Sequence, residues 1–123
     1  MQIELCESIE GLVRSERLAR EAADNSAQEW QKQIKKGDCF RRLYYGLEIY
    51  GEVLGDYGGN FRICHCYSFV CPEGEIGRVH VSTIDHLIDR QAFEKVRDKL
   101  GKAWRIAKMR LKNEAKYEEA AAT

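Results

Sequence analysis

The residues best suited to chemistry are the cysteines, two of which flank a histidine. Cys64-His65-Cys66 lies in a segment rich in strand-forming residues, with Cys71 shortly after it and Cys39 earlier in the chain. Successive side chains of a strand point to opposite faces, so Cys64 and Cys66 would share one side while His65 takes the other. Two thiolates on one side are half of a tetrahedral zinc site. Cys71 or Cys39 would have to complete it.

We expect these cysteines to pack in the core and to bind no metal. The Cys-x-x-Cys spacing of common zinc knuckles is absent, and cysteine is among the residue types most often buried. If a metal did bind, its ligands would come from Cys39, Cys64, Cys66 and Cys71. We expect no other cofactor. The five cysteines are an odd number, and the N-terminus lacks the pattern of a signal peptide. Free thiols and a cytoplasmic location are therefore expected.

The histidines are the candidate bases. His65 and His80 lie in two segments that we expect to pair as strands, whereas Asp85-His86 is interpreted as a solvated turn. Nucleophilic catalysis needs a nucleophile, a base and an orienting group that converge in space. No motif in the sequence indicates such a set, so we expect that the protein is not an enzyme.

Hydrophobic periodicity predicts helices at both ends of the chain. Apolar residues spaced by three, four and seven favour a helix within residues 1–36, ended by Gly37. Ser26 and Glu29 have capping-box spacing, which would break this helix in two. We favour a continuous helix because the apolar stripe stays in phase. A second stripe predicts a helix over residues 89–116, followed by a frayed tail at 117–123.

Between the helices, residues 38–82 alternate with a period of two and predict an antiparallel sheet of four to five strands. Gly51 lies inside the second strand, where a bulge or a close backbone approach is expected. Asp89 is a suitable N-cap for the helix that follows. The 123 residues thus form a single α+β domain, with a helix on either side of the sheet. No run of 18 apolar residues occurs, so no membrane partner is expected.

The central segment resembles a small SH3-like barrel. Such barrels often begin with a Lys-Gly-Asp step into the first strand and place Gly-x-Val in the second. Here these are Lys36-Gly37-Asp38 and Gly51-Glu52-Val53, and Gly77-Arg78-Val79 follows in the last predicted strand. The resemblance covers about 45 residues and implies a binding role, since similar barrels mostly bind peptides, proteins or nucleic acids. An open four-stranded sheet with helices on one face is equally compatible with the pattern.

Aromatic and arginine side chains cluster in the predicted sheet, where tyrosine and arginine are the residues that most often anchor interfaces. Half of the aromatics are expected to be core residues. The predicted partner-binding residues are Arg41, Arg42, Tyr44, Tyr45, Tyr50, Tyr57 and Arg62.

Charge is unevenly distributed although the net charge is zero. The first 29 residues are acidic overall, whereas the predicted C-terminal helix is strongly basic. Two interpretations stay open: the two helices pair through complementary charge, or the basic helix binds nucleic acid. The nucleic-acid candidates are Lys95, Lys99, Lys102, Arg105, Lys108, Arg110 and Lys112.

We therefore predict a non-enzymatic protein-binding module, a small accessory or inhibitory protein of bacterial or phage type. The alternative is a nucleic-acid-binding protein that uses the basic helix and the sheet aromatics. Trp30 and Trp104 each lie on an apolar helix stripe. Where a stripe is not buried inside one chain, a two-fold homodimer is the commonest way to bury it.

Overall fold

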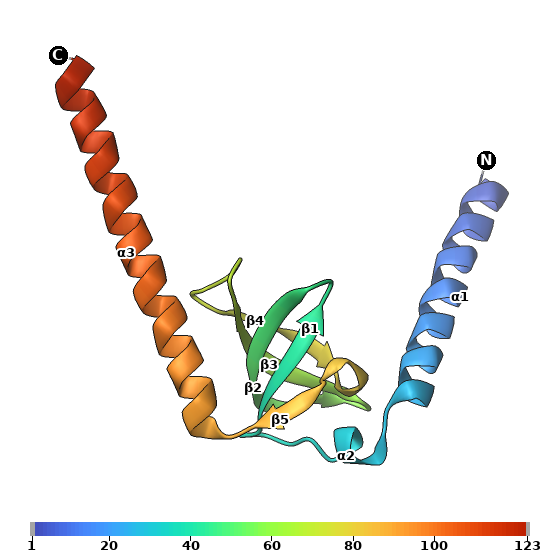
Figure 1. Ribbon diagram of the computed structural model, residues 1–123. Helices are drawn as coiled ribbons and strands as arrows, with labels where there is room; N and C mark the ends of the chain where they lie inside the picture. Colours follow the sequence, from blue (N-terminus) through green and yellow to red (C-terminus); the bar gives the residue numbers. More distant parts are fainter. Residues whose placement is uncertain (1, 123) are drawn as a thin grey trace.

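Two helical arms and a five-stranded antiparallel sheet make up the protein, which confirms the α+β class (Figure 1). The computed structural model describes residues 2–122, with the side chains of residues 3–119. The elements in chain order are α1 (Gln2–Ser26), α2 (Glu29–Lys32), β1 (Cys39–Tyr44), β2 (Leu47–Gly58), β3 (Phe61–Ser68), β4 (Glu75–His80), the 3-10 turn η1 (Val81–Thr83), β5 (His86–Ile88) and α3 (Arg90–Ala122).

The N-terminal helical segment is broken, so the prediction of a continuous helix was wrong. Ser26 does not cap α2: its hydroxyl donates back to the carbonyl of Ala23 at 2.8 Å and closes α1. Gln28 takes an extended conformation, and its backbone N–H donates to the side chain of Gln31 at 2.7 Å. A local hydrogen bond thus starts a new helix two residues later than the predicted Ser26–Glu29 box.

The strands run in the order β4-β3-β2-β1-β5, and every pair is antiparallel. The long strand β2 pairs with β1 in its first half and with β3 along most of its length, and two register shifts bend it after Val53 and Asp56. At Gly51 a Cβ would overlap the ring of Phe40. The close approach expected at Gly51 is therefore confirmed, although the bulges lie further along the strand.

The sheet extends beyond the predicted 38–82 segment. His86–Ile88 forms β5, paired with Cys39–Arg41 of β1, so the interpretation of Asp85-His86 as a solvated turn was wrong for His86, although both residues are exposed. The carboxylate of Asp85 accepts the backbone N–H of Leu43 at 2.6 Å. Three residues are too short to show a period of two, and tertiary pairing with β1 decides their conformation.

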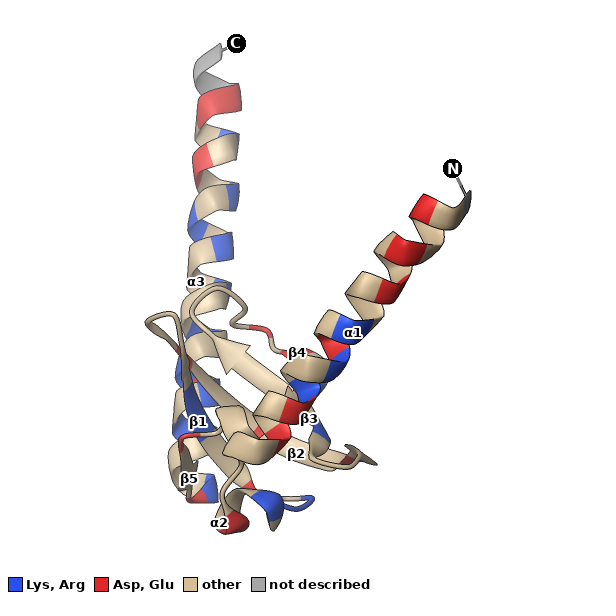
Figure 2. Ribbon diagram, turned by 90° about the vertical axis from the view of Figure 1, so that its right-hand side faces the viewer, with Lys and Arg blue, Asp and Glu red and all other residues tan. Residues whose placement is uncertain are grey.

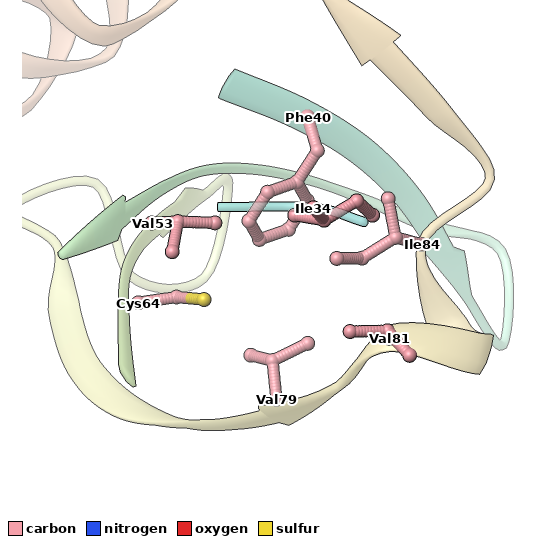
Figure 3. Close-up of a cluster of buried hydrophobic side chains, with 7 residues drawn as sticks. All are labelled: Ile34, Phe40, Val53, Cys64, Val79, Val81 and Ile84. Carbon is pink, nitrogen blue, oxygen red and sulfur yellow. The ribbon is translucent and has the colours of Figure 1, made fainter. Parts of the chain in front are cut away.

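The hydrophobic core lies on the inner face of the bent sheet. Its seven buried side chains point toward one another in Figure 3. They come from the residues just after α2, from strands β1 to β4 and from the segment after β4: Ile34, Phe40, Val53, Cys64, Val79, Val81 and Ile84. The face of β3 that carries Arg62, Cys64 and Ser68 is the buried one. The aromatic face of β3, with Phe61 and Tyr67, is only half buried.

Arg62 fastens α2 to the sheet. Its guanidinium donates to the carbonyls of Ile34, Lys32 and Gly59 at 2.8, 3.0 and 2.9 Å, and to that of Phe61 at 2.9 Å. The side chain is almost fully buried. Arg62 is therefore a structural residue, and its predicted place on a partner-binding surface was wrong.

The C-terminal helix α3 begins as predicted and is longer than predicted. The carboxylate of Asp89 accepts the backbone N–H groups of Gln91 and Ala92 at 2.9 and 3.2 Å, which confirms the N-cap. Phe93 is buried against the ring of Tyr67, 5.9 Å between centroids. The helix runs through Gly101 and on to Ala122, so the prediction of a frayed tail was wrong. The end of the chain is rich in Glu, Lys and Ala, which have high helix propensity. Thr123 lies outside the described residues.

The two helical arms do not pack side by side. Figures 1 and 2 both show α1 and α3 rising from different sides of the sheet and diverging, so that their outer ends lie far apart. The interpretation in which the acidic and basic helices pair within one chain is therefore wrong. Within residues 2–122, neither helix is long and apolar enough to cross a membrane.

Candidate protein-interaction surface

The cysteines differ in burial: Cys39 and Cys64 are buried, Cys66 and Cys71 are partly buried, and Cys6 is exposed on α1. Cys64 and Cys66 share the inner side of β3, as the alternation predicts, and Cys39 is buried in β1. Burial raises the pKa of the Cys64 thiol to about 12 and that of Cys66 to about 11, and it also raises the pKa of Cys39. Across the described part of the chain, no three His, Cys, Asp or Glu side chains gather as a metal site would require.

A Ser–His–Asp chain of hydrogen bonds is present at the end of α1. His80 Nε2 lies 2.7 Å from Asp24 Oδ1, and His80 Nδ1 lies 2.7 Å from the Ser82 hydroxyl and 3.1 Å from the Ser82 backbone nitrogen. A backbone N–H can only donate, so Nδ1 accepts and Nε2 carries the proton. The surface hollow beside His80 is lined by Arg20, Phe61, Arg78 and other residues, but not by Ser82.

These hydrogen bonds are best explained as an anchor that holds α1 on the sheet. Asn60 also donates to Asp24, at 3.1 Å, so the last turn of α1 is joined to β4 and to the β2–β3 turn. His65 is elsewhere, on the outer face of β3, with its Nδ1 3.3 Å from the Tyr67 hydroxyl. His65 and His80 lie on paired strands, as expected, but they lie apart, because His80 is opposite Phe61 and His65 is opposite Ile76.

The turn between β1 and β2 presents two tyrosines at its tip. Tyr45 and Gly46 both have positive φ, 49° and 81°, as in the two-residue turns that suit the twist of a hairpin. Tyr45 is 93% exposed, and its ring packs edge-on against that of Tyr44 at 4.6 Å between centroids. The positions favour Asn, Asp or Gly, so a tyrosine here is an exception that needs a reason.

A second apolar segment lies beside this turn. Ile49 of β2 pairs with Ser68 of β3, which places the residues after Ser68 next to the hairpin end. Phe69 and Val70 there are 84% and 75% exposed. Five exposed side chains thus lie at the same end of the sheet and are called the hairpin face from here on: Leu43, Tyr44, Tyr45, Phe69 and Val70.

A groove separates the hairpin face from α3. A hollow of about 630 Å³ is lined by Leu47, Tyr50 and Phe69 on the sheet side and by Val96, Leu100 and Ala103 on the helix side. A smaller hollow continues along α3 to Trp104 and Ala107. Both hollows are lined by Phe69, Leu100 and Ala103, so together they form an apolar channel along the helix with the exposed Phe69 ring beside it.

The predicted partner-binding residues lie at several separate positions on the sheet. Tyr44 and Tyr45 lie at the tip, and Arg42 lies behind them with its guanidinium 5.3 Å from the Tyr44 ring. Its buried Nε has no hydrogen-bond partner within the described residues. Arg41 forms an ion pair with Glu48, to which the Tyr50 hydroxyl donates at 3.1 Å. This pairing lowers the pKa of Glu48 and raises that of Arg41.

Tyr57 lies at the other end of β2, beneath the guanidinium of Arg78 at 5.3 Å, and so is remote from the hairpin face. Leu43, Phe69 and Val70 were missed, because sequence reasoning assigned apolar strand residues to the core. A usable signal was present: Phe69 and Val70 directly precede Cys71-Pro72, where the strand must end.

Comparisons with protein-family models, with curated proteins and with solved structures found no match.

The basic face of α3 is open to solvent. Apart from the partly buried Arg97, its lysines and arginines are exposed, and Figure 2 shows basic positions along most of the helix, with α1 standing away from them. Within the described residues, Lys108 pairs with Glu73 at 3.7 Å and Arg97 with its neighbour Asp98 at 3.2 Å. The nucleic-acid candidates Lys95, Lys99, Lys102, Arg105, Arg110 and Lys112 lie on the same exposed helix.

Proposed function

We propose that this protein is a non-enzymatic protein-binding module that contacts its partner through the hairpin face. Tyr45 carries the proposal. A left-handed conformation costs a residue with a Cβ roughly 1–2 kcal/mol, and this side chain recovers little of it by burial, being 93% exposed. A strained aromatic at an exposed tip supports a contact with another molecule.

The surroundings of Tyr45 support the same function. Tyr44 and Phe69 add aromatic area, and the guanidinium of Arg42 lies 5.3 Å from the centre of the Tyr44 ring. Aromatic and arginine side chains are the ones that dominate binding energies at protein interfaces. Five exposed apolar side chains at one end of the sheet also give more apolar surface than singly scattered residues would.

The resemblance to SH3-like barrels points the same way. Four strands were evident in the sequence, whereas the sheet has five, the number usual in such barrels. We propose that the sheet is a module of this kind, whose relatives mostly bind peptides, proteins or nucleic acids. A small accessory or inhibitory protein of the bacterial or phage cytoplasm is in keeping with 123 residues and free thiols.

The test is capture of partners from a bacterial lysate by the purified protein and its variants. Tyr45→Asn with Tyr44→Ser should lose the captured proteins, because the two anchors of the hairpin face are removed. Tyr57→Ser is the matched control: it removes an exposed tyrosine at the far end of β2 and should capture the same proteins as the wild type. Capture that persists in the double variant would overturn the proposal.

A second candidate is nucleic-acid binding through α3, favoured by the exposure of its basic face. Each phosphate contact releases counterions, so affinity should fall steeply with salt. The substitutions Lys102→Glu, Arg105→Glu and Lys108→Glu should abolish binding. Reversing Lys32, Lys35 and Lys36, which changes the net charge equally at exposed positions near α2, should weaken binding far less. Binding that is insensitive to salt would exclude this candidate.

A further inference from the structure

Most of α1, from Ile3 to Ala22, has no other element packed over it. Every residue from Ile3 to Ala22 is exposed, including an apolar stripe at heptad spacing formed by Leu5, Ile9 and Leu12. Leu12 is 71% exposed. The contacts that join α1 to the sheet lie near its C-terminal end, at Asp24 and Arg20. An isolated helix of this length is marginal in water, and most helices gain their stability by packing an apolar face.

The helix α3 also has an apolar stripe that is covered over only part of its length. Its first turns are buried by the sheet through Phe93, but the same stripe continues outward through Leu100, Ala103, Ala107 and Leu111. Leu100, Ala103 and Ala107 line the channel beside Phe69, and Leu111 lies beyond it, exposed. The open part of this stripe from Leu100 to Leu111 spans about 17 Å, close to the roughly 20 Å from Leu5 to Ala19 on α1.

Charge selects which two helices fit together. The outer half of α1 carries Glu4, Glu7 and Glu10 and no basic residue before Arg14. Ten basic residues against three acidic ones lie in residues 90–116. A parallel α1–α1 pair, or an α3–α3 pair, would place like charges together, whereas α1 against α3 joins the acidic outer half of α1 to the basic helix.

Within one chain this pairing cannot form. The sheet holds α1 and α3 apart, and the hydrogen bonds of Asp24 with His80 and Asn60 set the direction of α1 (Figures 1 and 2). Between two chains it can form twice, because a two-fold axis gives each copy's α3 the other copy's α1.

We propose that α1 of one copy packs along the apolar stripe of α3 in a second copy, so that the protein is a two-fold dimer with reciprocally exchanged arms. The occupant of the α3 channel is thus a second copy of this chain. The inference goes beyond the proposed function: the dimer uses the helix stripes and covers Phe69 beside the channel, but it leaves Tyr44 and Tyr45 at the hairpin tip free.

The experiment measures mass by sedimentation equilibrium over a range of concentrations. The wild type should approach twice 14.2 kDa. Glu4→Lys, Glu7→Lys and Glu10→Lys together should weaken the dimer about tenfold or more, as should Lys102→Glu, Arg105→Glu and Lys108→Glu, because three attractive pairs become repulsive. All six positions are exposed, so these substitutions do not disturb the core.

The decisive sample carries all six substitutions in one chain. Pairing of α1 with α3 predicts that the dimer returns, since the signs are exchanged on both helices. A dimer built from α1 against α1 would be weakened by the α1 changes and not rescued by those on α3, which overturns the proposal. A wild-type mass of 14.2 kDa at all concentrations also overturns it.

Failure of the dimer and failure of the proposed function are separable. Ile9→Gln with Leu12→Gln should give a monomer that still captures the same partners, and Tyr45→Asn should give a dimer that does not. A lower helix content of the monomeric variant, measured by far-UV circular dichroism, should accompany the loss of the α1 contact.

Discussion

Asp24 accepts a hydrogen bond of 2.7 Å from Nε2 of His80, and this contact joins the last turn of α1 to the end of β4. The same carboxylate accepts from Asn60 at 3.1 Å. This acidic side chain and its two donors, together with Arg20 over the Phe61 ring, therefore set the direction in which α1 leaves the sheet and the separation of the two arms.

Acid should loosen this anchor. The hydrogen bond from His80, followed by that from Asn60, holds the pKa of Asp24 below its ordinary value. A carboxyl group whose pKa is lower in the folded state than in the unfolded state stabilises the fold. That stabilisation is complete above the pKa of the unfolded state, about 3.9, and it is lost as the pH falls through the pKa of the folded state. We expect unfolding temperature to drop below about pH 4, and Asp24→Asn to show a smaller drop over the same range. An identical acid dependence in both proteins would contradict this assignment.

Removing the Arg62 guanidinium should destabilise the fold strongly. Arg62→Met leaves four carbonyls without their donor and should cost about 2–4 kcal/mol in urea unfolding. Arg78→Met is the control, because Arg78 lies on the neighbouring strand and is exposed over the rings of Tyr57 and Phe61. Its loss should cost about 1 kcal/mol or less. Equal effects of the two changes would show that the Arg62 hydrogen bonds are not what holds α2.

Gly51→Ala tests the close packing of β2 on the core. The added methyl group would overlap the Phe40 ring, and overpacking of this kind costs about 1–3 kcal/mol. Gly77→Ala in β4 meets nothing within 4 Å and should change stability by less than about 0.5 kcal/mol. Combining Gly51→Ala with Phe40→Leu should recover part of the loss, because the two sites are in contact. Purely additive effects would argue against the overlap.

Tyr45→Asn should stabilise the protein while it removes binding. Asparagine tolerates the left-handed conformation at the hairpin tip, so thermal or urea unfolding should show a gain of about 0.5–1 kcal/mol. Tyr44→Asn, outside the left-handed region, is the comparison and should not stabilise. A stability loss in Tyr45→Asn would mean that the tyrosine ring supports the hairpin itself.

The thiols should differ widely in reactivity near neutral pH. Cys6 is exposed on α1, whereas Cys64 and Cys66 have pKa values of about 12 and 11 because they are buried. A raised pKa leaves little thiolate, the reactive form. Mass spectrometry after brief alkylation should find Cys6 modified first, with Cys64 and Cys66 modified only under unfolding conditions. Early labelling of Cys64 would contradict the core in Figure 3.

Several features of the structure could be predicted from residues that are close together in the sequence. The change from a helical to a strand period marked the sheet, Asp89 marked the start of α3, and Gly51 marked a close backbone approach. The alternation of β3 placed Cys64 and Cys66 on one side. Each of these depends on residues near one another in the chain, where propensity and periodicity act directly.

Contacts between distant residues decided the rest. Tyr44 and Arg62 are both polar strand residues in the sequence, yet one is exposed at the hairpin tip and the other donates four buried hydrogen bonds. The short strand β5 exists only because β1 offers it an edge. The acidic and basic helices are complementary in composition, but the anchor at Asp24 holds them apart within one chain. Periodicity reports which face of an element is apolar; which neighbour covers that face depends on how the elements are joined in space.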